Sequence, residues 1–471
     1  MIEGLKPYAE YKESGQEWLC DVPLHWDVRR TKLLLREVDS RSHTGKEQLL
    51  RVSQYSGITQ RKAADRSDTQ DTRAASLVGY KRVALNDLVI NIMLAWNGSL
   101  GISRYDGIVS PAYCVYRFNK DALPWYFHKL FRLPLYKGRI KAASTGVVES
   151  RLRLYSDDLG RIEALFPPPD EQAAIVRFLD HANRKIDRFI RTKRKLIGLL
   201  NEQKQAIIQN AVTRGLNPDA PLKPSGIPWL GDIPAHWKQT RLKFEASHLV
   251  DCLHATPRYI NDGIYPAIRT ADIEPGKVRL EQARRISATE FKEWTARLKP
   301  EVGDILYSRE GERFGIAATV PVDATLCISQ RMMVFRIRKR QDSEYLMWQL
   351  NCQHVYLQAS CDVIGSTAPH VNVEQIKNFR LAMPPLDEQK AIVDHLGREC
   401  LFINTAIART EREISLMQEY RTRLTADMVT GKLDVREAAA KLPDLPANAD
   451  HSPDIDPQDE GLFEETEPLA E

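Results

Sequence analysis

The sequence contains the same unit twice, and this repeat constrains the fold more than any other feature. Residues 167–172, Pro-Pro-Pro-Asp-Glu-Gln, return as residues 384–389, Pro-Pro-Leu-Asp-Glu-Gln, at an offset of 217 (384 − 167). Upstream of each copy, Ser-Gly-x-x-Trp-Leu-x3-Pro-x-His-Trp occurs at residues 14–26 and 225–237, at an offset of 211 (225 − 14). Such a period is too long for a solenoid. We therefore expect two homologous units related by a pseudo-two-fold axis.

Length and composition are those of a multidomain globular protein. The 471 residues, 43% of them hydrophobic, have room for two or three domains with real cores. No apolar run approaches the roughly 18 residues of a membrane span, and the first residues lack a signal-peptide pattern. The seven cysteines include no Cys-x-x-Cys pair, which favours free thiols in a reducing compartment. We expect a cytoplasmic protein that does not contact a membrane.

Charge is distributed unevenly along the chain. Residues 441–471 contain ten Asp or Glu and one Lys, a net charge of −9, so the total of +4 leaves +13 on the remainder. A basic body suggests contact with a polyanion such as nucleic acid. A solvated basic surface with an acidic tail would give the same totals, so charge alone does not decide between the two.

Each unit is expected to contain a mixed α/β domain and one long helix. Short β-prone runs bounded by turn residues occur at 88–94 and 112–118, and again at 304–308 and 332–337. The residues around these landmarks differ between the halves, as expected for a retained scaffold with a diversified surface or for ordinary drift. We predict an α+β fold with a first domain (1–168), a first helix (169–214), a linker (215–224), a second domain (225–385), a second helix (386–433) and an acidic, disordered tail (434–471).

A coiled-coil seam follows each Asp-Glu-Gln motif. The seam positions step alternately by four and three residues over about six heptads, and both seams share the offset of 217. Gly215 and Gly431 supply the helix stops. Two such helices with a domain between them can return antiparallel, so we expect an antiparallel coiled coil. The main seam positions are Ile175, Leu179, Ile186, Leu200 and Ile207 in the first helix, and Ile392, Leu396, Ile403, Met417 and Leu424 in the second.

Signatures of catalysis are absent from the sequence. There is no Gly-x4-Gly-Lys-Ser/Thr loop, no Asn/Asp-Pro-Pro-aromatic motif, no Gly-rich strand–turn–helix for a methyl donor and no His-Glu-x-x-His spacing. His25 and His236 recur in step beside Trp26 and Trp237, which indicates a role in the scaffold. We predict no catalytic residue, no bound metal and no enzyme activity.

With these motifs in this order, the chain resembles the specificity subunits of type I restriction–modification systems over residues 14 to about 437. The resemblance implies two target-recognition domains alternating with two paired spacer helices. Each domain would read one half of a split, asymmetric site in double-stranded DNA. The helices would set the gap and dock two methyltransferase subunits and restriction subunits. The chain itself would hold no cofactor, with S-adenosylmethionine, ATP and Mg on its partners.

Candidate DNA contacts lie in the loops that differ between the halves. Arg can bind guanine and Asn can bind adenine in the major groove, while basic residues such as Arg132 and Lys137 could follow phosphates. For any single Arg, a solvated or internally paired side chain is the plainer interpretation. The candidates are Trp96, Asn97, Lys141, Ser144, Thr145 and Arg151 in the first half, and Arg309, Arg313, Gln330, Arg331, Ser366, Thr367 and His370 in the second.

Two other classes of function stay open at this point. A coiled-coil adaptor without DNA specificity would share the helices, although basic clusters in both domains argue against it. A methyltransferase or nuclease with an unrecognised active site would need motifs that this sequence lacks. Steep salt dependence of DNA binding would favour the recognition subunit over the adaptor.

Overall fold

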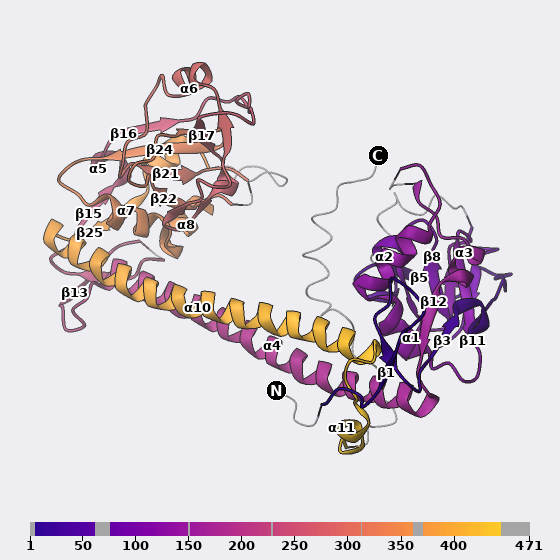
Figure 1. Ribbon diagram of the computed structural model, residues 1–471. Coiled ribbons are helices and arrows are strands. Elements are labelled where there is room, and N and C mark those ends of the chain that lie inside the picture. Colours follow the sequence, from indigo (N-terminus) through magenta and orange to yellow (C-terminus); the bar gives the residue numbers. More distant parts are fainter. Residues whose placement is uncertain are drawn as a thin grey trace. The chain divides into compact units, whose positions relative to one another are not determined.

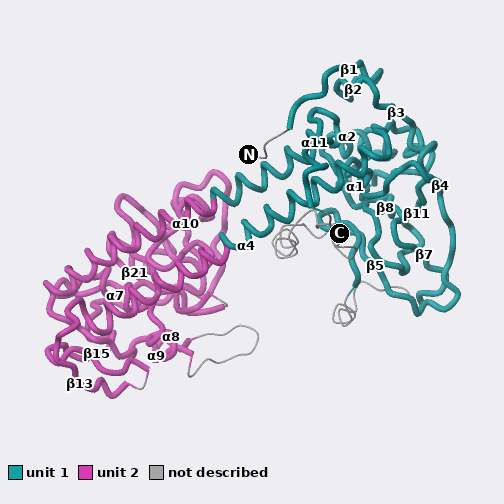
Figure 2. The backbone as a smooth tube through the Cα atoms, turned by 90° about the horizontal axis from the view of Figure 1, so that it is seen from below, with its two compact units in different colours: residues 1–193, 412–471 teal, residues 194–411 magenta. Residues whose placement is uncertain are grey.

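The computed structural model describes residues 5–61, 76–148, 151–227, 229–311, 313–360 and 371–443. The chain divides into two compact units: unit 1 comprises residues 1–193 and 412–471, and unit 2 comprises residues 194–411 (Figure 2). Two long helices, α4 (Pro169–Arg214) and α10 (Leu386–Val429), run through both units (Figure 1). Each unit therefore combines a mixed α/β domain with part of each long helix.

Unit 1 is organised around an antiparallel sheet of four strands in the order β4-β11-β8-β9. Short two-stranded ribbons and small helices surround this sheet. The strands are β1 (Tyr11–Lys12), β2 (Val22–Pro23), β3 (Asp27–Arg30), β4 (Leu35–Glu37), β5 (Leu50–Ser53), β6 (Gly57–Gln60), β7 (Lys81–Val83), β8 (Leu88–Asn91), β9 (Leu100–Ile102), β10 (Gly107–Val109), β11 (Tyr113–Phe118) and β12 (Glu163–Phe166). The helices are η1 (Thr31–Leu33), η3 (Ala95–Asn97), α1 (Pro124–Phe131), α2 (Pro134–Ala143), α3 (Ser156–Arg161) and α11 (Arg436–Ala440).

Unit 2 repeats this sheet as β16-β24-β21-β22, again antiparallel, and adds a three-stranded sheet β20-β17-β23. The strands are β13 (Leu222–Pro224), β14 (Asp232–Pro234), β15 (Lys238–Arg241), β16 (Ala246–Asp251), β17 (Tyr265–Ile268), β18 (Ile273–Glu274), β19 (Lys277–Val278), β20 (Arg284–Ile286), β21 (Ile305–Ser308), β22 (Ala317–Thr319), β23 (Cys327–Ile328), β24 (Met332–Ile337) and β25 (Arg380–Met383). The helices are α5 (Leu242–Glu245), η5 (Thr270–Asp272), α6 (Ala288–Trp294), α7 (Ser343–Leu350), α8 (Gln353–Ser360) and α9 (Val373–Lys377).

One ion pair fixes the same two strands in both sheets. In unit 1 the guanidinium of Arg117 on β11 donates to both carboxylate oxygens of Asp87, at 2.8 and 2.9 Å. In unit 2 Arg336 on β24 does the same to Asp304, at 3.0 and 2.8 Å. These hydrogen bonds raise the pKa of each arginine. The duplicated pair shows that the two sheets share a framework and not only a strand order.

The two repeated sequence motifs meet in space. In unit 1 Glu171, in the first turn of α4, accepts hydrogen bonds from Trp26 Nε1 at 3.0 Å and from the hydroxyl of Tyr8, and His25 Nε2 lies 2.8 Å from its second carboxylate oxygen. The Glu171 side chain is only 2% exposed. A carboxylate so deeply buried needs these donors. The Ser-Gly…His-Trp motif therefore anchors the start of the helix to the domain.

Unit 2 contains the same anchor in a weaker form. Glu388 in α10 accepts from Trp237 Nε1 at 3.1 Å, and His236 Nε2 lies 2.8 Å from its other oxygen. The Glu388 side chain is 26% exposed. The position equivalent to Tyr8 is Asp219 (8 + 211), so the third donor of unit 1 has no counterpart. As predicted, His25 and His236 belong to the scaffold.

The glutamine of each motif holds the domain to the helix as well. Gln172 donates to the carbonyl of Pro167 and accepts from the backbone N–H of Leu123, just before α1, both at 2.8 Å. Gln389 donates to Pro384 at 2.8 Å and accepts from the N–H of Asp342, just before α7, at 2.9 Å. The motif Pro-Pro-x-Asp-Glu-Gln is thus explained by a glutamate and a glutamine that join the helix to its own domain.

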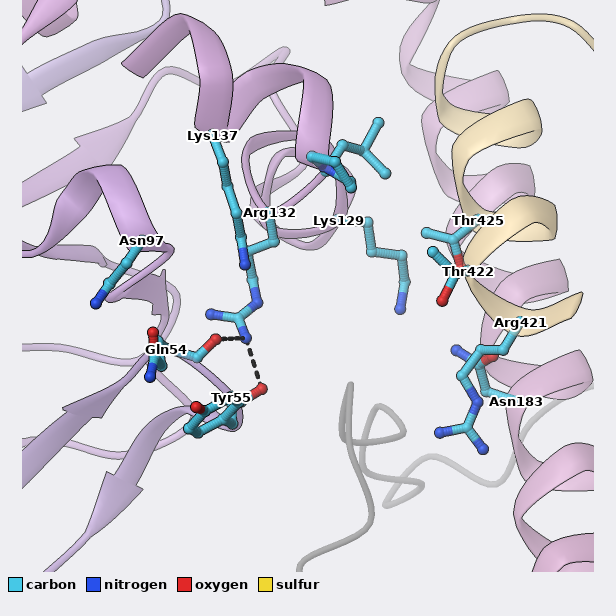
Figure 3. A pocket seen from close by; sticks show the side chains of 12 residues that line it. Gln54, Tyr55, Asn97, Lys129, Arg132, Lys137, Asn183, Arg421, Thr422 and Thr425 are labelled. Carbon is cyan, nitrogen blue, oxygen red and sulfur yellow. Dashed lines mark hydrogen bonds between the residues drawn. The ribbon is translucent and has the colours of Figure 1, made fainter. Parts of the chain in front are cut away.

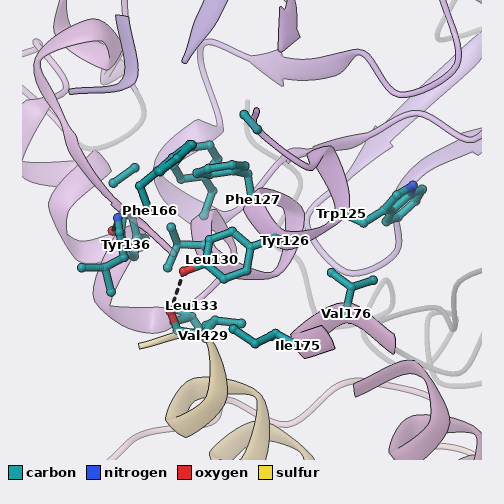
Figure 4. Packing of buried hydrophobic residues seen from close by; sticks show 14 of the residues in the cluster. Trp125, Tyr126, Phe127, Leu130, Leu133, Tyr136, Phe166, Ile175, Val176 and Val429 are labelled. Atoms are coloured by element: carbon teal, nitrogen blue, oxygen red, sulfur yellow. Dashed lines mark hydrogen bonds between the residues drawn. The ribbon is translucent and has the colours of Figure 1, made fainter. Parts of the chain in front are cut away.

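An aromatic core packs the domain of unit 1 onto the helices (Figure 4). Tyr126, Phe127 and Phe166 belong to a cluster that also contains Ile175 of α4 and Val429 of α10. The hydroxyl of Tyr126 donates to the carbonyl of Val429 at 2.9 Å. Each such aromatic side chain contributes about 1.5–3 kcal/mol on burial. In this unit, the domain and the helix ends therefore form one core.

Within unit 1 the long helices pair antiparallel. Lys193 of α4 forms an ion pair with Glu413 of α10 at 2.6 Å, and Asp187 pairs with Arg421. As residue numbers fall along α4 they rise along α10, which is the antiparallel relation. The predicted antiparallel pairing is confirmed for this unit.

Within unit 2 the corresponding helix segments also lie side by side. Lys204 of α4 donates to Asn404 of α10 at 2.9 Å, and Val212 lies in one apolar cluster with Ile392 and Leu396. Seven of the predicted seam residues are buried, namely Ile175, Leu179, Ile186, Ile392, Leu396, Ile403 and Leu424. The remaining three are half-buried, namely Leu200, Ile207 and Met417.

Segments beyond the helix ends differ from the prediction in two places. The predicted linker 215–224 includes strand β13, which pairs with β14. The prediction of disorder from residue 434 is wrong for residues 434–443, because they form α11 and Asp434 bonds to Lys6. The hydroxyl of Tyr11 also donates to the carbonyl of Lys432 at 3.2 Å. The rest of the acidic tail lies outside the described residues.

Candidate nucleic-acid interface

In unit 1, three candidate residues lie together where β8 ends. Trp96 and Asn97 form the short helix η3, which packs against α2, and the amino group of Lys141 on α2 lies 5.3 Å from the Trp96 ring centroid. The Asn97 side-chain oxygen accepts from the N–H and the hydroxyl of Ser99, at 3.1 and 2.9 Å. Its amide nitrogen has no partner among the described residues. The turn is thus rigid and presents a donor.

The loop after α2 brings three more candidates to the same side. The backbones of Thr145 and Arg153 exchange hydrogen bonds at 3.0 and 2.9 Å, and the N–H of Leu154 donates to Ile92 at the end of β8, at 2.9 Å. Thr145 and Arg151 are exposed, whereas the Ser144 hydroxyl donates to Ile140 at 2.8 Å and ends α2. The structure therefore brings the predicted residues of unit 1 near one loop cluster.

Apolar side chains around this cluster were not predicted. Val147 is fully exposed and Val148 is half exposed, and Met93 and Leu94 are each 40% exposed. Methyl groups in such positions can contact the methyl of thymine. No sequence pattern marked them, because an isolated apolar residue in a loop looks like a core residue.

Arg132, considered as a phosphate contact, has a structural role instead. Its guanidinium donates to four backbone carbonyls, those of Gly98, Leu100, Gln54 and Tyr55, at 2.6–3.0 Å. It therefore ties the η3 turn to the β5–β6 hairpin. The side chain could not be assigned from the sequence, since its acceptors lie 32 to 78 residues away.

In unit 2, the matching turn after β21 is held by Arg309. This side chain is buried, donates to Asp251 at 2.9 Å and to the carbonyl of Val371 at 3.3 Å, and pairs with Glu310 at 2.5 Å. The guanidinium of Arg313 donates to two carbonyls, at 3.2 and 2.7 Å. Both arginines shape the loop, which is the plainer alternative weighed for each single arginine.

The exposed face of this region in unit 2 is formed by other side chains. Gln330 and Arg331 are exposed, and Arg331 adopts a positive φ of 68°. Gln330 accepts from the hydroxyl of Thr256 at 3.2 Å, and His254, 69% exposed, pairs with Asp251 at 3.3 Å. His254 and Thr256 were missed because no motif marks them. The candidates Ser366, Thr367 and His370 lie outside the described residues.

Burial controls the ionisation of the thiol next to this turn. The Sγ of Cys252 accepts from the N–H of Arg331 at 3.2 Å, and burial raises the pKa of the thiol.

Six cysteines lie in the described part of the chain, and all are free. The same residues contain no cluster of His, Cys, Asp or Glu that could hold a metal ion, and none of their helices is long and apolar enough to cross a membrane.

Known proteins match this chain at the level of sequence and fold. Residues 253–412 match the model of the type I restriction modification DNA specificity domain. The chain is 21% identical over 370 residues to the type I restriction enzyme MjaVIII specificity subunit of Methanocaldococcus jannaschii, covering 76% of this chain and 83% of that protein. The chain thus contains a match to the DNA specificity domain and is similar over most of its length to specificity subunits of type I restriction enzymes.

Further comparisons extend over more of the chain. The provisionally named MjaX specificity subunit of the same organism is 21% identical over 452 residues, which are 90% of this chain and 98% of that protein. A chain from a structural study of complex assembly and conformational transition of the type I restriction–modification system has a TM-score of 0.62 at 15% identity. It covers 87% of this chain and 98% of that one, so the two share a fold.

Proposed function

We propose that this chain is a specificity subunit of a type I restriction–modification system and that it reads a bipartite, asymmetric DNA site, with the domain of each unit recognising one half-site. The observation that supports this is one framework carrying two different sets of exposed side chains. The sheets have the same strand order and the same Arg–Asp pair, yet η3 follows β8 where an arginine-centred turn follows β21. Two domains that share a framework but expose different side chains are expected to recognise different half-site sequences.

The contacts proposed in unit 1 combine a donor, cations and apolar groups. Asn97 offers an amide donor for a base edge, Lys141 and Arg151 offer charge for base or phosphate, and Thr145 offers a hydroxyl. The ring of Trp96, covered by Lys141, holds the turn in shape. Ser144 supports the loop from the end of α2.

The contacts proposed in unit 2 are centred on Arg331 and Gln330, with His254 added from the structure. Their side chains are exposed, and Arg331 can donate two parallel hydrogen bonds to guanine. Arg309 and Arg313 would position this turn from behind. Three further contacts are proposed on sequence grounds alone, namely Ser366, Thr367 and His370.

The helices are proposed to set the gap between the half-sites and to dock the partner subunits. Large apolar side chains stand exposed along them, at Leu196 and Leu199 on α4 and at Leu401, Phe402 and Leu416 on α10. Exposed apolar residues of this kind commonly mark protein interfaces. The partners would be two methyltransferase subunits and restriction subunits, which would carry S-adenosylmethionine, ATP and Mg in the cytoplasm.

Mapping of methylated adenines tests the proposal directly. A host without endogenous methylation would express the chain with its methyltransferase partner, and sequencing would give the methylated motif. We expect a two-part motif whose first half changes in Asn97→Ala and whose second half changes in Arg331→Ala. The exposed Lys120→Gln is the matched control. A continuous motif, or disappearance of both halves in either variant, would contradict the proposal, and methylation by the isolated chain would refute it.

A further inference from the structure

A hollow of about 290 Å³ lies in unit 1 between the domain and the helices (Figure 3). Arg132 and Lys137 line it from the domain, and Asn183, Arg421 and Thr422 line it from α4 and α10. It also borders Asn97 of the η3 turn, so it adjoins the candidate DNA contacts of this unit.

The lining of the hollow is cationic. It includes Lys129, Arg132, Lys137 and Arg421, and among the described residues that line it there is no Asp or Glu. Lys129 forms a buried ion pair with Asp180 at 3.3 Å, and Arg421 pairs with Asp187. These two pairs fix the cations at the wall. A recess lined by one sign of charge concentrates anions.

One buried side chain in the wall lacks a hydrogen-bond partner. Asn183 is 3% exposed, and its side-chain oxygen has no partner among the described residues. Buried amides normally have partners. A carboxamide carries two donors and an acceptor, and a half-turn about its last bond exchanges them. In Figure 3 it lies beside Arg421 on the helix side of the hollow. The amide therefore points to an occupant with polar atoms.

Unit 2 fills the same place with apolar residues. With the helix offset of 217, Asn183 corresponds to Cys400 (183 + 217) and Thr425 to Ile208 (425 − 217), and both counterparts are buried in one apolar cluster. With the offset of 219 between α1 and α7 (343 − 124), Lys129 corresponds to Trp348, which packs against that cluster. The polar hollow is thus a particular property of unit 1 and not of the shared framework.

We propose that this hollow binds a phosphate group, and that the group is a backbone phosphate of the DNA next to the half-site read by unit 1. Lys137 and Arg421 would neutralise the oxyanion, and Asn183 and Thr422 would donate to its oxygens. The identification of the phosphate as DNA rests on the proposed function, because the hollow adjoins the η3 turn. This contact would increase the affinity for DNA of any sequence. It would do so only at the half-site read by unit 1.

Inorganic phosphate tests the hollow without DNA. Thermal unfolding of the full chain is measured in phosphate and in chloride at equal ionic strength, for the wild type, Asn183→Asp, Lys137→Gln and the exposed control Lys120→Gln. General salt effects act on all four proteins alike. We expect phosphate to raise the Tm of the wild type and the control by roughly 2–4 °C more than that of the other two variants. Equal shifts in all four would overturn the site.

Duplex DNA of unrelated sequence tests the source of the phosphate. Fluorescence anisotropy over a salt series gives the slope of log K against log salt, and removing one protein–phosphate interaction makes this slope shallower by about 0.9. We expect Asn183→Asp and Lys137→Gln to reduce the slope by about that amount and to weaken binding roughly three- to tenfold, with Lys120→Gln unchanged.

The two measurements separate the possible failures. Weaker phosphate stabilisation in the variants with an unchanged DNA slope would overturn DNA as the source and leave free phosphate or a phosphate monoester as the ligand. If the wild type bound no duplex at any salt concentration, the proposed DNA recognition would fail, and the phosphate measurement would still decide whether the hollow is an anion site. Lys137→Gln lies at the domain wall and guards against a folding defect in Asn183→Asp.

Discussion

In both units a domain is joined to the two long helices. The contact at the start of the helix is the same in units 1 and 2, but the contact further along the helix is polar in unit 1 and apolar in unit 2. The Trp–Glu anchor is present in both, with nearly equal distances of 3.0 and 3.1 Å. Further along α4, unit 1 has a buried Lys–Asp pair and a hollow, where unit 2 has Trp348 and Gly397 (180 + 217). The anchor is thus what the fold requires, while the position further along the helix is available for a ligand.

The largest expected effect comes from breaking the ion pair that distinguishes unit 1. Lys129 and Asp180 have side-chain exposures of 2% and 1%, so Asp180→Asn leaves a buried cation without its counterion. We expect the free energy of unfolding to fall by about 3–5 kcal/mol, measured by urea denaturation. Hydrogen exchange should locate this destabilisation in unit 1.

The double variant Lys129→Met with Asp180→Leu is the matched control. Apolar replacements of a buried pair are often close to neutral, as the apolar counterpart in unit 2 suggests. A cost below about 1 kcal/mol for Asp180→Asn alone would contradict the burial of this pair.

Replacing the anchoring glutamate should destabilise the protein more in unit 1 than in unit 2. Glu171 is nearly fully buried with three partners, whereas Glu388 is partly exposed with two. Replacing Glu by Gln turns an acceptor into a donor that faces other donors. We expect Glu171→Gln to cost about 3 kcal/mol and Glu388→Gln about 1.5 kcal/mol in urea denaturation. Equal costs would show that the third partner, Tyr8, contributes nothing.

Acid should destabilise unit 2 through a residue that unit 1 lacks. His354 is fully buried, neither ring nitrogen has a partner among the described residues, and burial lowers its pKa from 6.5 to about 4. The unfolded chain binds a proton as pH falls below 6.5, but the folded chain does so only near 4. This stability is therefore complete above pH 6.5 and is lost toward pH 4.

For a shift from pH 7 to pH 5, the His354 contribution amounts to about 2 kcal/mol of stability. Urea denaturation at the two pH values measures it, and His354→Leu should remove this part of the pH dependence. An unchanged difference between the two pH values in His354→Leu would assign the effect to other groups.

The last comparison concerns the glycines at the helix ends. Gly431 and Gly215 have φ of 77° and 73°. A Cβ at Gly431 would lie 2.5 Å from the ring of Pro23, whereas at Gly215 the nearest atom is a carboxylate oxygen of Glu388 at 2.9 Å. We expect Gly431→Ala to lower the free energy of unfolding by about 2 kcal/mol and Gly215→Ala by about 1.5 kcal/mol.

Gly15→Ala and Gly226→Ala separate backbone strain from crowding at these ends. Both glycines have positive φ and open space where a Cβ would lie. Each substitution should cost only about 1 kcal/mol. Thermal denaturation of the four variants under one condition gives the ranking, and an equal cost in all four would show that crowding at Gly431 is relieved by movement of Pro23.

Periodicity predicted the helices and the repeat predicted the two like units, because both signals extend over many residues. The strand predicted at 88–94 ends at Asn91, and η3 begins at Ala95. The chain turns between them, but residues 92–94 are apolar and therefore looked like a continuation of the strand. The pairing of Glu171 with Trp26 gives the repeated motifs a physical reason that spacing alone did not supply.

Individual contacts were less predictable than elements. Arg309 looked available in the sequence, but its partner Asp251 lies 58 residues earlier, and only the folded sheet brings the two together. The hollow of unit 1 was invisible for the same reason, because Asn183, Lys137 and Arg421 come from three separate helices. Tertiary contacts at such separations have no local pattern.

The segment around Lys6 meets Asp434 in unit 1, where unit 2 has the unbroken stretch from Gly215 to Leu222. The same junction is thus made once by covalent bonds and once by hydrogen bonds alone. A gene rearranged to start near residue 218, with a short connector from residue 443 to residue 5, would encode a polypeptide able to make all of the same contacts. In such a chain the interrupted junction and the continuous one would simply exchange places.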